Sequence, residues 1–200
     1  MGQNIYLYYD EASSEGVLID SGCNKEDRYT IESIIRENNI TIKAILLTHG
    51  HYDHIIGVDE LRKLTSATIY CHKAEKQMLE NPDLNLSVRF GIEAQVMPDQ
   101  LLSDEDKFRF GNTTLKVIHT PGHTPGGVCF YDEGNRNLFS GDTLFDDSIG
   151  RTDLPSGDHA LLVNSINTKL MSLPDDTIVY SGHGAKTTIG KEKKSNQFLK

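Results

Sequence analysis

The sequence predicts an α/β protein in which β-sheets form the inner layers and helices cover them. Segments with the apolar period of a strand alternate with segments that have the period of a helix, and turn residues separate them. This alternation is typical of a sheet sandwich with helices outside. The 200 residues carry no linker, tandem repeat or low-complexity tract, so we expect one domain over residues 1–200.

The first half of the chain alternates between strands and helices. In order, we expect strands at 5–9 and 16–20, a helix at 25–39, a strand at 42–47, a helix at 58–64, a strand at 68–70 and a helix at 74–80. Ile31, Ile34 and Ile35 recur at helical spacing, and so do Val58 and Leu61. The polar stretch between the first two strands predicts a hairpin.

The second half of the chain is dominated by β-structure. In order, we expect strands at 107–110, 114–118, 128–131 and 137–139, a helix at 160–173 that ends before Pro174, and a strand at 177–180. The preceding residues 81–106 contain two prolines and little periodicity. We expect a long loop there that overhangs a site.

Composition and charge exclude several classes of protein. No apolar run is as long as a membrane span, which argues against a transmembrane protein. The net charge of −9 disfavours binding to nucleic acid, because an acidic surface repels the phosphate backbone. No secretory signal begins the sequence, so we expect a cytoplasmic protein. The three cysteines form no Cys-x-x-Cys pair, which argues against a disulfide framework and a cysteine zinc site.

Four potential metal ligands lie within six residues, directly after the apolar strand at 42–47. They are His49, His51, Asp53 and His54. In an extended segment His49 and His51 face the same way, whereas the other two follow as the chain turns into the next helix. The four side chains can therefore point at two neighbouring positions. Imidazole and carboxylate groups suit zinc, iron or manganese.

Three further candidate ligands occupy the same setting, a strand end followed by a glycine-rich turn. They are His123 in Pro-Gly-His-Thr, Asp142 in Ser-Gly-Asp-Thr and His183 in Ser-Gly-His-Gly. Glycine allows backbone and ligands to crowd around one centre. Structural zinc sites are usually closed by cysteines, whereas a site of histidines and aspartates leaves a coordination position open. The pattern therefore favours a catalytic metal site.

The pattern His-x-His-x-Asp-His, together with the later Gly-His-Thr, Gly-Asp-Thr and Gly-His-Gly segments, resembles the metallo-β-lactamase fold superfamily. The resemblance implies a four-layer αββα sandwich with two metal ions at one edge of the sheets. By motif position it assigns one ion to His49, His51 and His123, the other to Asp53, His54 and His183, and a bridging role to Asp142. Asp20, in Leu-Ile-Asp-Ser-Gly, is similar to a structural aspartate of the superfamily.

Within that superfamily, Gly-Asp-Thr-Leu-Phe at 141–145 and Gly-Arg-Thr-Asp at 150–153 are similar to glyoxalase II-like thioester hydrolases, above all their short bacterial relatives. This resemblance implies a hydroxyacylglutathione hydrolase-like enzyme that cleaves a small thioester or related acyl substrate. Metal-bound hydroxide would attack the carbonyl carbon, with Asp53 orienting the nucleophile. Arg151 takes the place of a basic substrate contact, although a salt bridge to Asp153 or Asp158 explains it equally well.

Other functions are compatible with the same ligands. Persulfide dioxygenases, which depend on iron, share the seven ligands and a similar Gly-Arg-Thr-Asp segment. Lactonases or other hydrolases of the superfamily are a further alternative. Antibiotic degradation is disfavoured, because such members usually have cysteine or serine where this chain has Asp142. A non-catalytic metal-binding role would need a closed pocket. We favour two zinc ions, with iron or manganese as alternatives.

Overall fold

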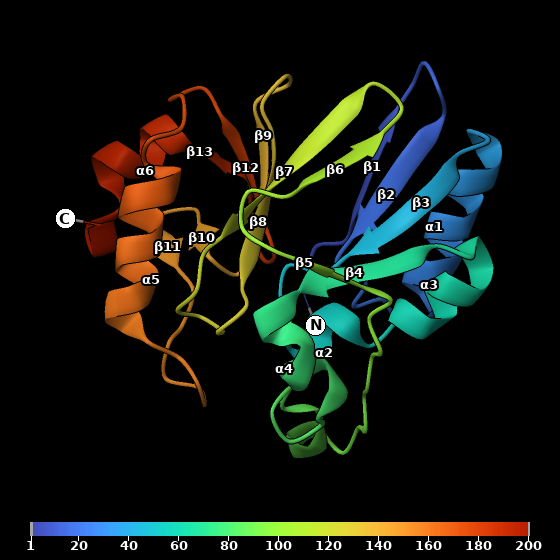
Figure 1. The fold of residues 1–200 in the computed structure, drawn as a ribbon, viewed down its shortest axis with the longest axis horizontal. Coiled ribbons are helices and arrows are strands. Elements are labelled where there is room, and N and C mark those ends of the chain that lie inside the picture. Colours follow the sequence, from blue (N-terminus) through green and yellow to red (C-terminus); the bar gives the residue numbers. More distant parts are fainter. Residues whose placement is uncertain (1, 200) are drawn as a thin grey trace.

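The computed structural model describes residues 2–199, and its two large β-sheets lie face to face between outer helices (Figure 1). One sheet and its helices come from the first half of the chain, coloured blue to green, and the other from the second half, coloured yellow-green to red. This arrangement confirms the predicted αββα sandwich. That the chain is one domain stays a prediction.

The first sheet has the strand order β1-β2-β3-β4-β5. β1 and β2 form the expected antiparallel hairpin, and the remaining neighbours are parallel. The strands are β1 (Tyr6–Asp10), β2 (Glu15–Ile19), β3 (Thr41–Leu46), β4 (Thr68–His72) and β5 (Gln100–Leu102). Both faces of this sheet are covered, which explains why the ends of β2 and β3 are continuous apolar runs.

The helices of the first half lie on the outer face of this sheet (Figure 1). They are α1 (Lys25–Glu37), α2 (Tyr52–Ile55), α3 (Val58–Thr65) and α4 (Lys76–Glu80), the last preceded by the 3₁₀ turn η1 (Lys73–Glu75). The Asn24 side chain accepts hydrogen bonds from the backbone N–H groups of Glu26 and Asp27, and the Asp27 carboxylate accepts one from Asn24. This capping box fixes the start of α1.

The second sheet has the strand order β13-β12-β9-β8-β7-β6. β12 and β9 are parallel, and the other neighbours are antiparallel. The strands are β6 (Lys107–Phe110), β7 (Thr113–His119), β8 (Val128–Asp132), β9 (Asn137–Gly141), β12 (Ile178–Ser181) and β13 (Thr187–Thr188). Outside it lie α5 (His159–Ser165), its π-helical continuation η3 (Ile166–Leu170), α6 (Ile189–Ser195) and the 3₁₀ turn η4 (Gln197–Leu199). Among residues 2–199, no helix combines the length and apolar character that crossing a bilayer requires.

Three apolar layers hold the sandwich together. Val17 and Ile19 point from β2 into the layer between the sheets, whereas Leu18 points to the helices outside, as the two-residue period of a strand requires. Phe130 of the second sheet is fully buried in the central layer. Leu162 of α5 belongs to the third layer, which lies on the outer face of the second sheet. Each side chain of this size contributes roughly 1.5–3 kcal/mol when it is fully buried.

Residues 81–106 are not the continuous loop that the sequence predicts. They contain a 3₁₀ turn, η2 (Ser87–Phe90), and the edge strand β5, which pairs with β4. β5 has three residues and carries little strand signal. A small hairpin of β10 (Leu144–Phe145) and β11 (Ser148–Ile149) is likewise absent from the expected elements, because strands of two residues have no recognisable period.

Candidate metal centre

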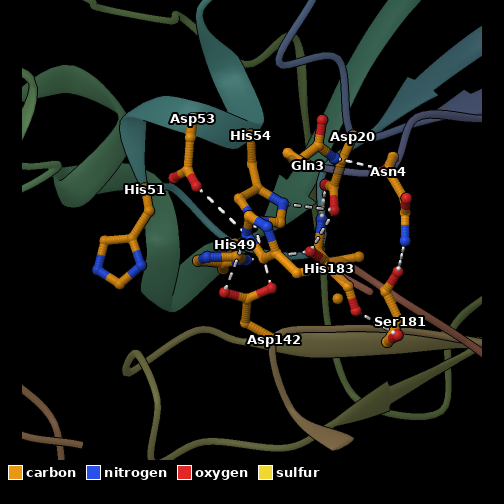
Figure 2. Close-up of polar contacts among 12 residues, drawn as sticks. Gln3, Asn4, Asp20, His49, His51, Asp53, His54, Asp142, Ser181 and His183 are labelled. Carbon is orange, nitrogen blue, oxygen red and sulfur yellow. Dashed lines mark hydrogen bonds and ion pairs between the residues drawn. The ribbon is translucent and has the colours of Figure 1, made fainter. Parts of the chain in front are cut away.

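The seven predicted ligands lie at one edge of the sandwich, on the loops that follow four of its strands. The histidine-rich segment follows β3 and runs into α2, so Asp53 and His54 belong to that short helix. His123 follows β7, Asp142 follows β9 and His183 follows β12. The structure therefore brings residues from both halves of the chain to one place (Figure 2).

The first ligand group consists of His49, His51 and His123. One ring nitrogen from each lies within 4.8 Å of the other two, and all three side chains are buried. His51 Nδ1 is 3.0 Å from His123 Nε2. His123 Nδ1 donates a hydrogen bond of 2.7 Å to the carbonyl oxygen of Arg151, so its Nε2 is the nitrogen that faces the other candidate ligands.

The first group is composed of neutral imidazoles. Burial lowers the pKa of His49 well below its ordinary value, and the neighbouring histidines lower it further. Burial likewise lowers the pKa of His51 to about 3 and also lowers that of His123. Neutral imidazole is the form that binds metal. The buried Nε2 of His49 has no hydrogen-bond partner among residues 2–199. A buried nitrogen without a partner, close to other histidines, is consistent with a metal ligand.

The second ligand group consists of Asp53, His54 and His183, whose candidate ligand atoms also lie within 4.8 Å of one another. His183 Nε2 is 3.3 Å from both Asp53 Oδ2 and His54 Nε2. The side chains of His183 and Asp53 are 34% and 20% exposed, so this group is more open than the first. The hydrogen bond from His183 to Asp53 raises the pKa of the histidine.

Asp142 is close to both groups, and Figure 2 shows its carboxylate facing His54 and His183. Its Oδ1 is 3.3 Å from His54 Nε2, and its Oδ2 is 3.7 Å from His123 Nε2 and 3.6 Å from His183 Nε2. Burial acts to raise the pKa of Asp142, but the surrounding histidines outweigh it and lower the pKa to about 2. A Cβ on Gly182 would lie 2.2 Å from Asp142 Oδ1, which explains the glycine before His183.

Asp20 supports His54 from the end of β2. Its Oδ2 lies 2.9 Å from His54 Nδ1 and accepts a hydrogen bond from the Thr48 hydroxyl, while its Oδ1 accepts one from the Thr48 backbone. Burial acts to lower the pKa of His54, but Asp142 and Asp20 together raise it above its ordinary value. Because Asp20 occupies Nδ1, the Nε2 of His54 faces the centre.

Glu75 is a supporting residue that sequence reasoning missed. It is fully buried, and its carboxylate accepts hydrogen bonds from the backbone N–H of Gly50 at 2.8 Å, the backbone N–H of Gly126 at 2.6 Å and the Thr124 hydroxyl at 3.1 Å. Gly50 lies between two histidines of the first group, and Gly126 follows His123. Burial raises the pKa of Glu75 to about 7, although the three donors act to lower it. In the sequence nothing distinguishes this glutamate from a solvent-facing helix residue.

Arg151 lies at the rim of the site, where its guanidinium is occupied by another side chain. Its Nε and one terminal nitrogen each donate a hydrogen bond of 2.7 Å to the Asp153 carboxylate, and both side chains are exposed. The salt bridge to Asp153, one of the alternatives predicted for Arg151, is therefore present. A contact between Arg151 and substrate stays a prediction.

A cavity of about 900 Å³ opens beside the two ligand groups. Side chains of both groups form part of its lining, together with the apolar residues Tyr52, Phe90, Phe145, Ile149 and Leu154. Phe90 comes from η2, in agreement with the expectation that residues 81–106 overhang a site. Volume and lining are those of a site for a small molecule. The open cavity argues against a closed, purely structural metal site.

Comparison with known proteins identifies the class to which this fold and site belong. Residues 1–183 match the family model of the metallo-beta-lactamase superfamily. The chain belongs to this superfamily and is a metallo-hydrolase of that kind.

Three proteins are similar to this chain over nearly its whole length. Hydroxyacylglutathione hydrolase GloC of Haemophilus influenzae is 36% identical over 200 residues, which cover 98% of this chain and 92% of the relative. The crystal structure of the BLEG-1 B3 metallo-beta-lactamase is 45% identical, with a TM-score of 0.91 and coverage of 98% of this chain and 94% of that one. The structure of TTHA1623 in a di-iron-bound form is 36% identical, with a TM-score of 0.84 and coverage of 98% and 95%.

Proposed function

We propose that this protein hydrolyses a small thioester in a reaction like that of hydroxyacylglutathione hydrolases. The proposal rests on the position of the Asp142 carboxylate, which lies within 3.7 Å of histidines from both ligand groups. This carboxylate also lines a cavity of the size of a small molecule. The likeness to GloC supports a thioester as the substrate class.

Seven side chains would hold two divalent metal ions. His49, His51 and His123 would bind one ion, Asp53, His54 and His183 the other, and Asp142 would contact both. Metal ions in such a site supply hydroxide at neutral pH and polarise a carbonyl group. The donor set is compatible with zinc, iron or manganese, and zinc is our first choice for a hydrolase.

The chain's own residues orient the reactants. Asp53 lines the cavity, so its carboxylate would orient the attacking water, while Asp20 and Glu75 hold the surrounding loops. In the reaction, the water oxygen forms a bond to the acyl carbon and the carbon–sulfur bond breaks. The products are a carboxylic acid and a thiol, which takes the remaining proton. A thiolate leaves readily because the pKa of a thiol is about 8.5.

The test is elemental analysis of protein purified without added metal, together with assays of the same preparation. Hydrolysis of S-lactoylglutathione or another thioester, lost after exhaustive chelation and restored by metal, is the expected result. Thioester hydrolysis that persists in the metal-free protein would contradict the proposal.

Two rival activities are measured on the same preparation. The similarity to a di-iron protein favours testing iron-dependent persulfide oxidation, measured as oxygen uptake on glutathione persulfide. The similarity to a B3 metallo-beta-lactamase favours testing a chromogenic cephalosporin. Turnover in either of these assays without thioester hydrolysis would replace the proposed function.

A further inference from the structure

We propose that Arg89 and the stacked rings of Tyr52 and Phe90 form a subsite for a thioester that carries a carboxylate group. The inference rests on the proposed function and defines its substrate class. It assigns a role to η2, which lies in the overhanging segment and supplies none of the metal ligands.

The aromatic part of the subsite adjoins the metal centre. Tyr52 is the first residue of α2 and directly precedes Asp53. Its ring stacks on that of Phe90 with centroids 4.4 Å apart and planes 24° from parallel. Tyr52 is buried, whereas Phe90 of η2 is 59% exposed. Both line the cavity, so the pair presents an apolar wall to a bound substrate.

Arg89 adds a positive charge to this wall that no acidic side chain neutralises. It lines the cavity and is exposed, and within residues 2–199 its guanidinium has neither an ion pair nor a hydrogen bond. The other cavity arginine, Arg151, is bonded to Asp153. Asp146, also in the lining, pairs with Lys191 outside the cavity. Arg89 is therefore the available cation for an anionic group of the substrate.

The backbone of the wall is held in place before any ligand binds. Asn85 is fully buried, and its side chain donates a hydrogen bond of 2.7 Å to the Ala94 carbonyl and accepts one of 3.0 Å from the Ser87 backbone. The Asn85 carbonyl accepts a hydrogen bond of 3.0 Å from the Tyr52 backbone, which ties η2 to the helix of the second ligand group. Leu86, just before η2, has a φ of 70°, a conformation that costs free energy for a residue with a side chain.

These features define what the substrate must offer. A carboxylate matches the planar guanidinium, which binds such groups through two parallel hydrogen bonds. An apolar chain would lie on the Tyr52–Phe90 wall while the thioester carbonyl reaches the metal centre. The carboxylate could belong to the acyl part or to the thiol part of the thioester, and the experiment separates these two sources.

Three thioesters and three variants test the subsite in the metal-loaded protein. S-acetyl-N-acetylcysteamine is neutral, S-acetyl-3-mercaptopropionate has its carboxylate on the thiol side, and S-succinyl-N-acetylcysteamine has it on the acyl side. The variants are Arg89→Ala, Arg89→Lys and the control Arg109→Ala. Arg109 is likewise exposed and has no ion pair among residues 2–199, but it lies on β6 and does not line the cavity.

We expect Arg89→Ala to raise KM about tenfold for one or both carboxylate substrates, with kcat and the neutral substrate little changed. The substrate that responds identifies the side on which the carboxylate lies. Arg89→Lys should recover part of the loss, because it keeps the charge without the planar fork. Arg109→Ala should behave as the unaltered protein. Equal effects of Arg89→Ala on neutral and charged thioesters, or no effect on any, would overturn the inference.

A binding measurement separates this inference from the proposed function. Calorimetric titration with 3-(methylthio)propionate, which cannot be hydrolysed, should give an affinity about tenfold weaker in Arg89→Ala. The neutral amide of the same compound should bind both proteins equally. If no thioester turns over but this difference is found, the proposed function fails and the anion subsite stands. If the two proteins bind 3-(methylthio)propionate equally and Arg89→Ala changes the KM of neither carboxylate thioester, the subsite is refuted even when thioesters are hydrolysed.

Discussion

The two ligand groups differ in how the protein surrounds them. In the first, His49, His51 and His123 are buried, and the loops that carry them share the Glu75 carboxylate. In the second, His183 and Asp53 are partly exposed, and His183 Nδ1 is held by the carbonyl of Gly2, near the start of the chain, at 3.1 Å. The first group is thus buried throughout, whereas the second combines the buried His54 with two partly exposed side chains.

This difference suggests a division of labour within one centre. A buried group with fixed ligands favours permanent binding of an ion, because its hydrogen-bonded supports preserve the geometry when the ion leaves. A partly exposed group admits substrate and solvent, as catalysis requires. Asp142 is close to histidines of both groups, so we expect the affinities of the two groups for metal to depend on this carboxylate.

The largest effect is expected from Asp142→Ala, which removes the carboxylate that lies close to histidines of both ligand groups. Turnover should fall about 10³-fold, since metal-assisted charge stabilisation accounts for several kcal/mol of catalysis. The bound metal per chain should fall as well. Steady-state kinetics and elemental analysis measure the two quantities. A variant that keeps full turnover would show that the groups work independently of Asp142.

A smaller, selective effect is expected from Glu75→Gln. The amide nitrogen of glutamine would face a backbone N–H or the threonine hydroxyl where an acceptor is now present, so one supporting hydrogen bond is lost. The affinity for one ion, that of the first group, should fall by about 10- to 100-fold while the other ion is retained. Titration against a chromophoric chelator measures both affinities.

Glu192→Gln is the matched control for that variant. Glu192 is also fully buried and accepts three hydrogen bonds, from the Thr187 hydroxyl, the Asn196 amide and the Asp147 backbone. It contacts none of the metal ligands. Equal loss of metal in both variants would mean that Glu75 acts only through overall stability.

The smallest effect concerns the intrinsic order of metal release. In the unaltered protein, the ion of the partly exposed second group should leave first, with an affinity about tenfold below that of the first. Stepwise addition of a chelator, followed by elemental analysis, should therefore give a stable species with one ion per chain. Simultaneous release of both ions would show that the difference in exposure has no thermodynamic consequence.

From the sequence alone, the candidate ligands and the layers of the fold could be predicted, but the side chains that hold the ligand loops could not. Each of the seven ligand candidates follows a predicted strand, and strand ends meet at a sheet edge, so their proximity could be inferred. Glu75 contacts glycines that are 25 and 51 residues away, and no local pattern encodes such contacts. Arg89 lies in a segment without periodicity, so its position at the cavity could not be predicted. That position depends on the packing of η2 against Tyr52.

Both ligand groups draw on both halves of the chain, which has a consequence for the stability of the fold. The first group combines His49 and His51 of the first half with His123 of the second, and the second group adds His183 to Asp53 and His54. Each bound ion would therefore cross-link the two sheets. The melting temperature should rise with the concentration of free metal, so metal supply would regulate the lifetime of the folded protein as well as its activity.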